Sequence, residues 1–231
     1  MWNRKEIKEK AKNAFKANYW KTVVVSLLFL VIGGGGGLLA LNSGSGSGSE
    51  ALVNQFGELS PEEMIAIVIA LVGSLAVIGL ISFLVRLFLL NPLMVGCQKF
   101  YRENAEAPAE YSELGAGFKK NYGNVVFTTF LTDLFQALWL MLFIIPGLVK
   151  AYSYRMVPFI IADNPEMKAL DAITKSRDMM RGHKWKAFVL DLSFLGWLIL
   201  SGITLGILGI FYVNPYIFET NAELYLALKD N

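Results

Sequence analysis

The sequence is poor in the residues from which most metal and redox sites are built. Its 231 residues include one cysteine, Cys97, and one histidine, His183. A single cysteine excludes a disulfide framework within the chain and a thiolate metal cluster, so no redox function is indicated. A single histidine between basic residues excludes a histidine metal site and gives little basis for Ser-His-Asp catalysis. We therefore expect a protein that is not an enzyme and that holds no metal or other cofactor.

A phosphate-binding glycine motif is also lacking. The five glycines Gly33 to Gly37 fall within an apolar stretch rather than between a strand and a helix, and no Gly-Lys-Ser/Thr follows them. Their small size favours close helix contact instead. The Gly/Ser run at 43–49 predicts a flexible loop. Basic runs flank the apolar segments, so anionic lipid headgroups are the expected partner and nucleic acid is not.

Hydrophobic residues make up 55% of the chain and gather in blocks. Soluble domains have roughly 45–50%. Residues 22–41 and 64–90 carry no charge except Arg86. Each block is long enough to cross a hydrocarbon core of about 30 Å, which predicts membrane spans. A cleaved signal peptide is disfavoured, because the first block exceeds the usual apolar length and no small-residue cleavage site closes it.

The distribution of positive charge predicts the orientation in the membrane. Residues 1–21, 99–123 and 164–186 contain seven, four and six Lys/Arg, whereas the acidic connection at 42–63 contains none. By the positive-inside rule, the basic segments are cytoplasmic and the connection is external. We therefore expect a multi-pass protein of the bacterial plasma (inner) membrane, with both termini in the cytoplasm and an even number of spans.

A similar unit occurs three times along the chain. Each copy begins with a basic, aromatic segment, passes through two apolar stretches separated by a turn, and ends at a proline, which predicts a helical hairpin. The aromatic residues that we expect to anchor the hairpin starts at the membrane interface are Tyr19, Trp20, Tyr122 and Trp185. The residues at which we expect a kink or a helix end are Asn91, Pro92, Pro158, Asn214 and Pro215.

The fold class expected from these patterns is an all-α polytopic membrane protein with six transmembrane helices in three hairpins, plus amphipathic interfacial helices. The chain forms one membrane domain, 1–231. Its expected segments are an N-terminal amphipathic helix (1–21), hairpin 1 (22–98) with a Gly/Ser-rich outer loop (42–60), hairpin 2 (124–162), a cytoplasmic interfacial helix (164–182), hairpin 3 (187–218) and a cytoplasmic tail (219–231).

Local signals refine these boundaries. Asn3 is a predicted N-cap for the first amphipathic helix, and Gly182 is the predicted end of the second. Pro146-Gly147 predicts the turn of hairpin 2. Residues 187–218 fit either one long tilted helix or two helices, and a turn within 201–206 agrees better with the repeat.

Three charged residues within the apolar stretches form a candidate intramembrane polar site. At 1.5 Å per residue, Asp133 lies about 20 Å and Arg155 about 13 Å from the expected turn of hairpin 2, and Asp191 lies about 16 Å from that of hairpin 3. A lone charge at mid-membrane costs about 2.5–3.5 kcal/mol, which pairing offsets. Either a structural ion pair or a polar site for a lipid headgroup, a peptide or an ion is expected. Lys150, near the turn of hairpin 2, is expected to extend to the outer interface.

Several segments resemble a bacterial integral membrane family known as domain of unknown function 975. The segments that carry this resemblance are 1–8, 91–96, 158–166, 175–186 and 191–197. The central pattern with Pro146-Gly147 and Pro158 is also similar to the membrane domain of some bacterial glycerophosphoryl diester phosphodiesterases. That domain accompanies a separate hydrolase, so the likeness carries over no catalytic residue. The resemblance implies a bacterial inner-membrane protein and leaves its activity open.

The function that we expect is that of a non-enzymatic membrane module, which binds lipid or supports assembly or export by a partner. The alternative is a small transporter or channel, in which Arg155, Asp133 and Asp191 line a substrate path. The expected partners are membrane lipids, with anionic headgroups at the cytoplasmic face, and a membrane protein.

Overall fold

The computed structural model describes residues 2–32, 60–119 and 121–229, and all regular elements within these ranges are helical. The α-helices, in chain order, are α1 (Arg4–Ala17), α2 (Tyr19–Ile32), α5 (Pro61–Val85), α6 (Asn91–Glu106), α7 (Tyr122–Leu142), α8 (Ile144–Tyr154), α9 (Val157–Asp163), α10 (Ala169–Met179), α11 (Lys184–Leu192), α12 (Leu195–Ile203) and α13 (Asn214–Lys229). Two π-helical turns, η1 (Arg86–Leu90) and η3 (Gly209–Val213), and a 3-10 helix, η2 (Tyr111–Phe118), complete them. The all-α prediction is confirmed for these residues.

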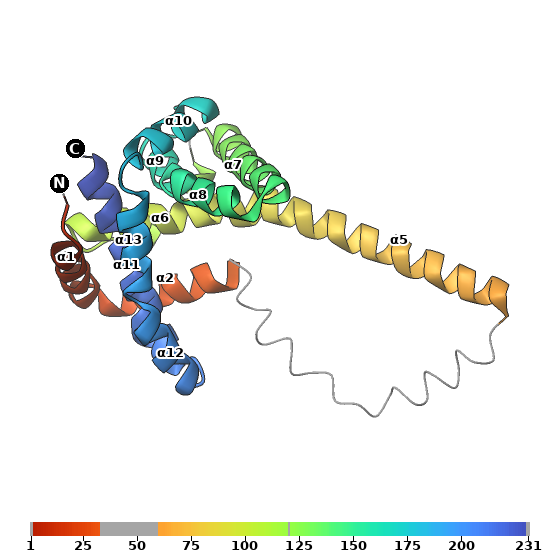
Figure 1. Cartoon of the computed structure of the whole chain (residues 1–231), viewed down its shortest axis with the longest axis horizontal. Coiled ribbons are helices and arrows are strands. Elements are labelled where there is room, and N and C mark those ends of the chain that lie inside the picture. The colour runs from red at the N-terminus through yellow and green to blue at the C-terminus, as the bar shows by residue number, and fades with distance from the viewer. Residues whose placement is uncertain (1, 33–59, 120, 230–231) are drawn as a thin grey trace.

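The helices form a body from which α5 extends as a single arm, while α1 and the C-terminal end of α13 lie on the opposite side (Figure 1). Side chains of α5 are not buried within the protein. The predicted glycine-rich contact surface at 33–37 and the outer loop at 42–60 lie outside the described residues, except for Ser60. Ser60 caps α5, because its Oγ accepts from the Glu63 N–H and the Glu63 carboxylate accepts from the Ser60 N–H.

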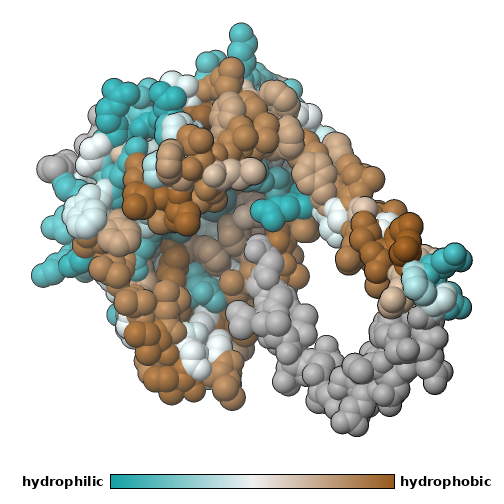
Figure 2. Space-filling view, turned by 45° about the vertical axis from the view of Figure 1, so that its right-hand side comes forward, coloured by the Kyte–Doolittle hydropathy of each residue, from teal (hydrophilic) through white to brown (hydrophobic). Residues whose placement is uncertain are grey.

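Within the described residues, three helices are long and apolar enough to cross a membrane: Pro61–Glu106, Tyr122–Leu142 and Lys184–Ile203. The pair Arg4–Ala17 and Tyr19–Ile32, bent by 105°, makes a fourth if it is counted as one span. Figure 2 shows hydrophobic residues over the α5 arm and the lower end of the molecule, where α12 lies, while hydrophilic residues gather on the left and upper sides. These features support a membrane protein, and the number of six spans stays a prediction.

Two of the predicted helix ends lie inside continuous helices instead. The helix of 46 residues from Pro61 to Glu106 passes through Asn91-Pro92, which follows the π-helical turn η1. Pro92 has no N–H for the Phe88 carbonyl four residues earlier. The Tyr122 hydroxyl donates to this carbonyl at 2.5 Å, so a neighbouring hairpin supplies the missing donor.

The same arrangement occurs at the second Asn-Pro pair. Asn214-Pro215 follows the π-helical turn η3 without a break in the helix. Phe211 lies four residues before Pro215, and its carbonyl accepts a hydrogen bond from the Tyr19 hydroxyl at 3.1 Å. Of the predicted kink or helix end at the Asn-Pro pairs, the helix end is excluded, because each helix continues through a π-helical turn and a tyrosine from another helix pairs with the freed carbonyl.

Pro158 behaves as predicted, whereas the turn of hairpin 2 is displaced. The helix breaks between α8 and α9, just before Pro158. The turn between α7 and α8 lies at Phe143, whose backbone is extended, and Pro146 falls in the first turn of α8. A proline fits there because the first N–H groups of a helix have no partner in the helix. At 1.5 Å per residue α8 is about 16 Å long, about half of a hydrocarbon core.

Hairpin 3 consists of two arms, in agreement with the favoured interpretation. The chain turns after α12 at Leu205 and Gly206, which both have positive φ. It then returns through η3 into α13, where Glu219, Leu224 and Tyr225 are buried. Residues 219–229 of the predicted cytoplasmic tail form the C-terminal part of α13 and pack into the body of the protein.

The two predicted amphipathic helices differ from the expectation in what they contact. The Asn3 side chain caps α1 as predicted, but the helix ends at Ala17, before the 105° bend into α2. The buried face of α1 packs against α13, and the Tyr216 hydroxyl of α13 donates a hydrogen bond to the Lys8 carbonyl of α1. The second helix, α10, is shorter than 164–182 and stops before Gly182, whose φ of 76° explains the end. Both helices are therefore part of the folded body.

Close packing of α6 on η2 leads to a first prediction. A Cβ added at Gly96 would overlap the Leu114 backbone carbonyl, whereas one added at Gly79 meets no atom within 4 Å. We expect Gly96→Ala to lower stability by about 1–3 kcal/mol, because the backbone has to move. Thermal unfolding of the purified protein in detergent, followed by circular dichroism, measures this loss. Gly79→Ala is the control, and equal stability of the two variants would contradict the close packing.

Candidate functional site

The structure joins two of the three residues of the predicted intramembrane polar site. Arg155, directly after α8, donates to both oxygens of Asp191 in α11, each at 2.7 Å. The Tyr152 hydroxyl donates to the same carboxylate at 2.9 Å, and the Asn221 side chain accepts from Arg155. This bidentate pair therefore links α8, α11 and α13.

Asp133 does not share this group. Its Oδ2 accepts from the Asn91 side chain at 3.2 Å, and with Arg86 it lines a pocket between the ends of α5 and α7. Although α7 packs against α8, it also contacts α6 and η1, and the Asp133 side chain lies on that side, next to Asn91. The predicted triad is thus divided into two polar groups.

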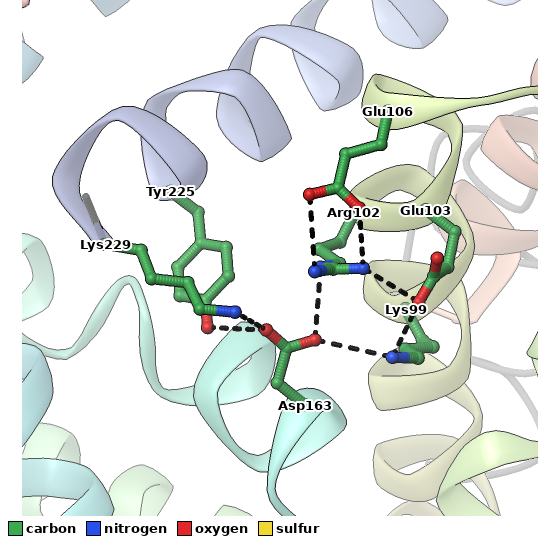
Figure 3. Close-up of polar contacts among 7 residues, drawn as sticks. All are labelled: Lys99, Arg102, Glu103, Glu106, Asp163, Tyr225 and Lys229. Carbon is green, nitrogen blue, oxygen red and sulfur yellow. Dashed lines mark hydrogen bonds and ion pairs between the residues drawn. The ribbon is translucent and has the colours of Figure 1, made fainter.

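A third polar group, which the sequence did not indicate, lies at the last residue of α9 (Figure 3). Asp163, with a side chain only 6% exposed, forms ion pairs with Lys99 and Arg102 of α6 through Oδ1, at 3.4 and 3.2 Å. Its Oδ2 accepts from the Tyr225 hydroxyl at 3.0 Å and from Lys229 at 2.7 Å, both of α13. One carboxylate therefore connects α6, α9 and α13, the helices that contain Pro92, Pro158 and Pro215.

The environment of Asp163 favours its ionised form. Burial alone would raise the pKa of the carboxyl, but the Lys229 hydrogen bond and the charges of Arg102, Lys229 and Lys99 outweigh it and lower the pKa. All its contacts are met by side chains of the same body. This arrangement is that of a structural link between helices.

A basic pocket lies where α8, α10 and α11 meet. This Lys184 pocket has a volume of about 360 Å³ and is lined by Lys150, Ser153, Arg177, Arg181, Gly182, Lys184 and Trp185. None of these residues is acidic. Arg181 pairs with Asp178 at 2.8 Å, and the other three cations form no ion pair with a described residue. The pocket therefore presents an excess of positive charge to whatever enters it.

A second basic pocket lies on the other side of Trp185. This Lys186 pocket, of about 540 Å³, is lined by Trp2, Asn3, Arg4, Trp185, Lys186 and Val189. It forms because the chain before α1 lies against the start of α11, where the buried Trp2 ring is 6.2 Å from the His183 ring. Trp185, 73% exposed, is the wall that the two pockets share.

Sequence reasoning identified part of this region. Trp185 was expected at an interface, and anionic headgroups were the expected partner of the basic segments. Lys150 was expected at the outer end of hairpin 2, but the structure places it beside Lys184, over the Trp139 ring at 4.4 Å. In the sequence, the two lysines on either side of Trp185 were the feature that could have indicated a basic site. Lys150 joins them only because α8 packs on α11.

A further polar groove lies among α1, α6 and α13, with a volume of about 800 Å³. Glu223 lines it, and burial, followed by the carboxylates of Glu106 and Glu6, raises the pKa of Glu223 from its ordinary 4.5 to about 7 against the opposing charge of Lys10. One turn earlier, the buried Glu219 accepts from the Asn104 side chain, and burial raises its pKa well above the usual range. These glutamates make the stability of the body depend on pH.

Among the described residues, no group of three or more His, Cys, Asp or Glu side chains is placed to hold a metal ion. Cys97 is buried among apolar neighbours.

Comparison with known proteins agrees with the resemblance seen in the sequence. The model of the family DUF975, a protein family of unknown function, matches residues 140–231. The match confirms that resemblance over α8 to α13, and it includes five of the six cations around Trp185. The likeness to phosphodiesterase membrane domains stays a prediction. No curated protein and no solved structure matches the chain.

The Asp163 link leads to a second prediction. Asp163→Asn leaves three cations without their shared anion, so we expect a loss of about 2–3 kcal/mol in the free energy of unfolding. Asp178→Asn is the control, because its pair with Arg181 is exposed, and we expect it to cost less than about 1 kcal/mol. Denaturant titration in detergent measures both. A loss no larger for Asp163→Asn than for the control would contradict the structural role.

Glu223 leads to a third prediction. Its folded-state pKa exceeds the unfolded value, so the protonated form stabilises the fold below about pH 4.5, and this contribution is lost as the pH rises through about 7. Glu223→Gln should remove this part of the pH dependence. Thermal unfolding between pH 4.5 and 8 tests it: the unfolding temperature of the unmodified protein should fall more steeply than that of the variant. Parallel curves would contradict the prediction.

Proposed function

We propose that this chain, whose residues 140–231 match the DUF975 family of unknown function, is a non-enzymatic membrane module that binds anionic lipid headgroups at its cytoplasmic face. The observation that carries the proposal is the Lys184 pocket. It gathers Lys150, Arg177 and Lys184 from three helices, and Arg181 from the turn between α10 and α11, around one small volume.

The chemistry of the pocket suits a phosphate group. Lysine supplies a compact charge with three donors, and arginine supplies a planar fork that matches phosphate oxygens. Four formal positive charges, one of them paired with Asp178, repel one another around the pocket. A bound anion relieves this repulsion, which favours binding.

The position of the pocket favours a lipid over a free anion. Lys184 is the first residue of the candidate span Lys184–Ile203, and Trp185 is 73% exposed beside it. The next turns of this helix expose Phe188 and Leu192. A phosphate in the pocket would therefore have apolar surface directly above it for acyl chains, and tryptophan is enriched at this boundary.

The orientation follows from the charge distribution. The basic pocket, both termini and the three basic segments are assigned to the cytoplasmic side of a bacterial inner membrane, with three hairpins entering the bilayer from that side. Polybasic sites on this side meet the negative surface potential of the inner leaflet. A role in assembly or export by a partner stays a prediction from the sequence.

The intramembrane polar groups support a structural role in preference to transport. The Arg155 charge is matched by a bidentate contact with Asp191, and Asn221 accepts from the same guanidinium. Asp133 lies in another group. A substrate path through Arg155, Asp133 and Asp191 would need these three side chains to face one cavity, so we do not favour the transporter.

Lipid titration of the purified full chain in detergent tests the proposal. Phosphatidylglycerol should bind more tightly than phosphatidylcholine, which carries no net charge. In the double variant Arg177→Gln, Lys184→Gln, the affinity for phosphatidylglycerol should fall about 30-fold, because each cation near an anionic lipid is worth about 1 kcal/mol.

The matched control for this experiment is the double variant Lys5→Gln, Lys175→Gln. Both lysines are exposed and do not line the pocket, so their removal changes the net charge by the same amount without changing the site. Equal weakening by the control would show general charge attraction rather than a site. Equal binding of the two lipids by the unmodified protein would overturn the proposed function.

A further inference from the structure

We propose that the Lys184 and Lys186 pockets act together as one site for a lipid headgroup that carries two phosphates, with Trp185 between them. This inference rests on the proposed function and specifies which class of anionic lipid is bound. The two phosphates are joined through a short polyol linker, and the acyl chains lie along the exposed apolar face of α11 and α12.

Helix geometry places the two cationic centres on opposite sides of the indole. Successive residues of an α-helix are separated by about 100°, so Lys184 and Lys186 point about 200° apart, with Trp185 between them. The pocket linings agree, since Lys184 lines one pocket, Lys186 lines the other, and Trp185 lines both. A ligand that reaches across one side chain therefore meets both pockets.

Each pocket has cations of its own from separate parts of the chain. The Lys184 pocket takes Lys150 and Arg177 from α8 and α10. The Lys186 pocket takes Arg4 from the start of α1. Arg4 and Lys186 form no ion pair with a described residue, and no described acidic side chain lines the second pocket. Each pocket therefore offers its own cations to a separate anionic group.

A single ligand with two phosphates suits this arrangement better than two separate lipids. Two independent headgroups would each lose their freedom of motion, and their negative charges would repel each other on either side of Trp185. When the phosphates are covalently joined, binding of the first raises the effective concentration of the second. The pocket volumes of about 360 and 540 Å³ suit headgroup fragments on either side of Trp185.

The number of cations in each pocket indicates which pocket contributes more to binding. The Lys184 pocket has four cations and holds the first phosphate, whereas the Lys186 pocket has two and holds the second. Loss of the Lys186 pocket should therefore reduce the preference for the two-phosphate lipid and leave binding of a one-phosphate lipid in place. This difference separates the present inference from the proposed function.

The test compares cardiolipin, as the two-phosphate probe, with phosphatidylglycerol at equal total phosphate and equal acyl chains. The purified full chain is titrated in detergent, and bound lipid is counted by native mass spectrometry. We expect the unmodified protein to bind cardiolipin at least about 10-fold more tightly per phosphate, with one molecule per chain at saturation.

The double variant Arg4→Gln, Lys186→Gln should reduce this preference to less than about 2-fold while its affinity for phosphatidylglycerol stays within 2-fold of the unmodified protein. Lys5→Gln, Lys175→Gln is the matched control, because both lysines are exposed and line neither pocket. It removes the same charge and should keep the preference. Circular dichroism and thermal unfolding of each variant confirm that the fold is intact.

Three outcomes would overturn the inference. Equal binding of the two lipids at matched phosphate, together with phosphatidylglycerol binding that depends on Lys184, would leave the proposed function standing and remove the two-phosphate site. Complete displacement of cardiolipin by inorganic pyrophosphate at equal concentration would show a site for a free anion. Failure of both lipids to bind would contradict the proposed function as well.

Discussion

One buried carboxylate, that of Asp163, holds together the helices on which the rest of the body is built. It is the last residue of α9, and its four partners come in pairs from α6 and α13. A charge this deeply placed is stable only because cations and a hydroxyl surround it, and the same contacts fix how the three helices approach one another. α1 is then set against α13, and α10 and α11 follow directly from α9 along the chain.

The tyrosine contacts connect the hairpins to this body. A proline inside a helix leaves the carbonyl four residues earlier without its donor, and in a membrane protein such a group finds no bulk water near the hydrocarbon region. Tyr122 and Tyr19 supply that donor to Phe88 and Phe211 from neighbouring hairpins. When the three predicted hairpin starts are aligned on Trp20, Gly123 and Trp185, the position of Tyr19 and Tyr122 is taken by Lys184, which lines the basic pocket with Ser153. The position at which the third repeat has a lysine instead of a tyrosine therefore lies in the candidate lipid site.

Local signals in the sequence were sufficient for features that depend on few residues. The cap at Asn3, the helix end before Gly182 and the turn at Leu205 and Gly206 each follow from the chemistry of a short segment. Depth counting put Arg155 and Asp191 at similar distances from their turns, and the structure shows the two side chains in contact. Four features could not be predicted, because each depends on residues far apart in the sequence. They are the donors for the Asn-Pro helices, the packing of α13, the neighbours of Lys150 and the partners of Asp163.

The most direct test of lipid binding at Trp185 is a structure of the protein in a lipid nanodisc that contains anionic phospholipid. We expect phosphate density within hydrogen-bonding distance of Lys184 and Arg177, with acyl-chain density running over Phe188. A basic pocket that faces bulk solvent away from the bilayer, with no phosphate beside Lys184, would contradict the assignment of a lipid site.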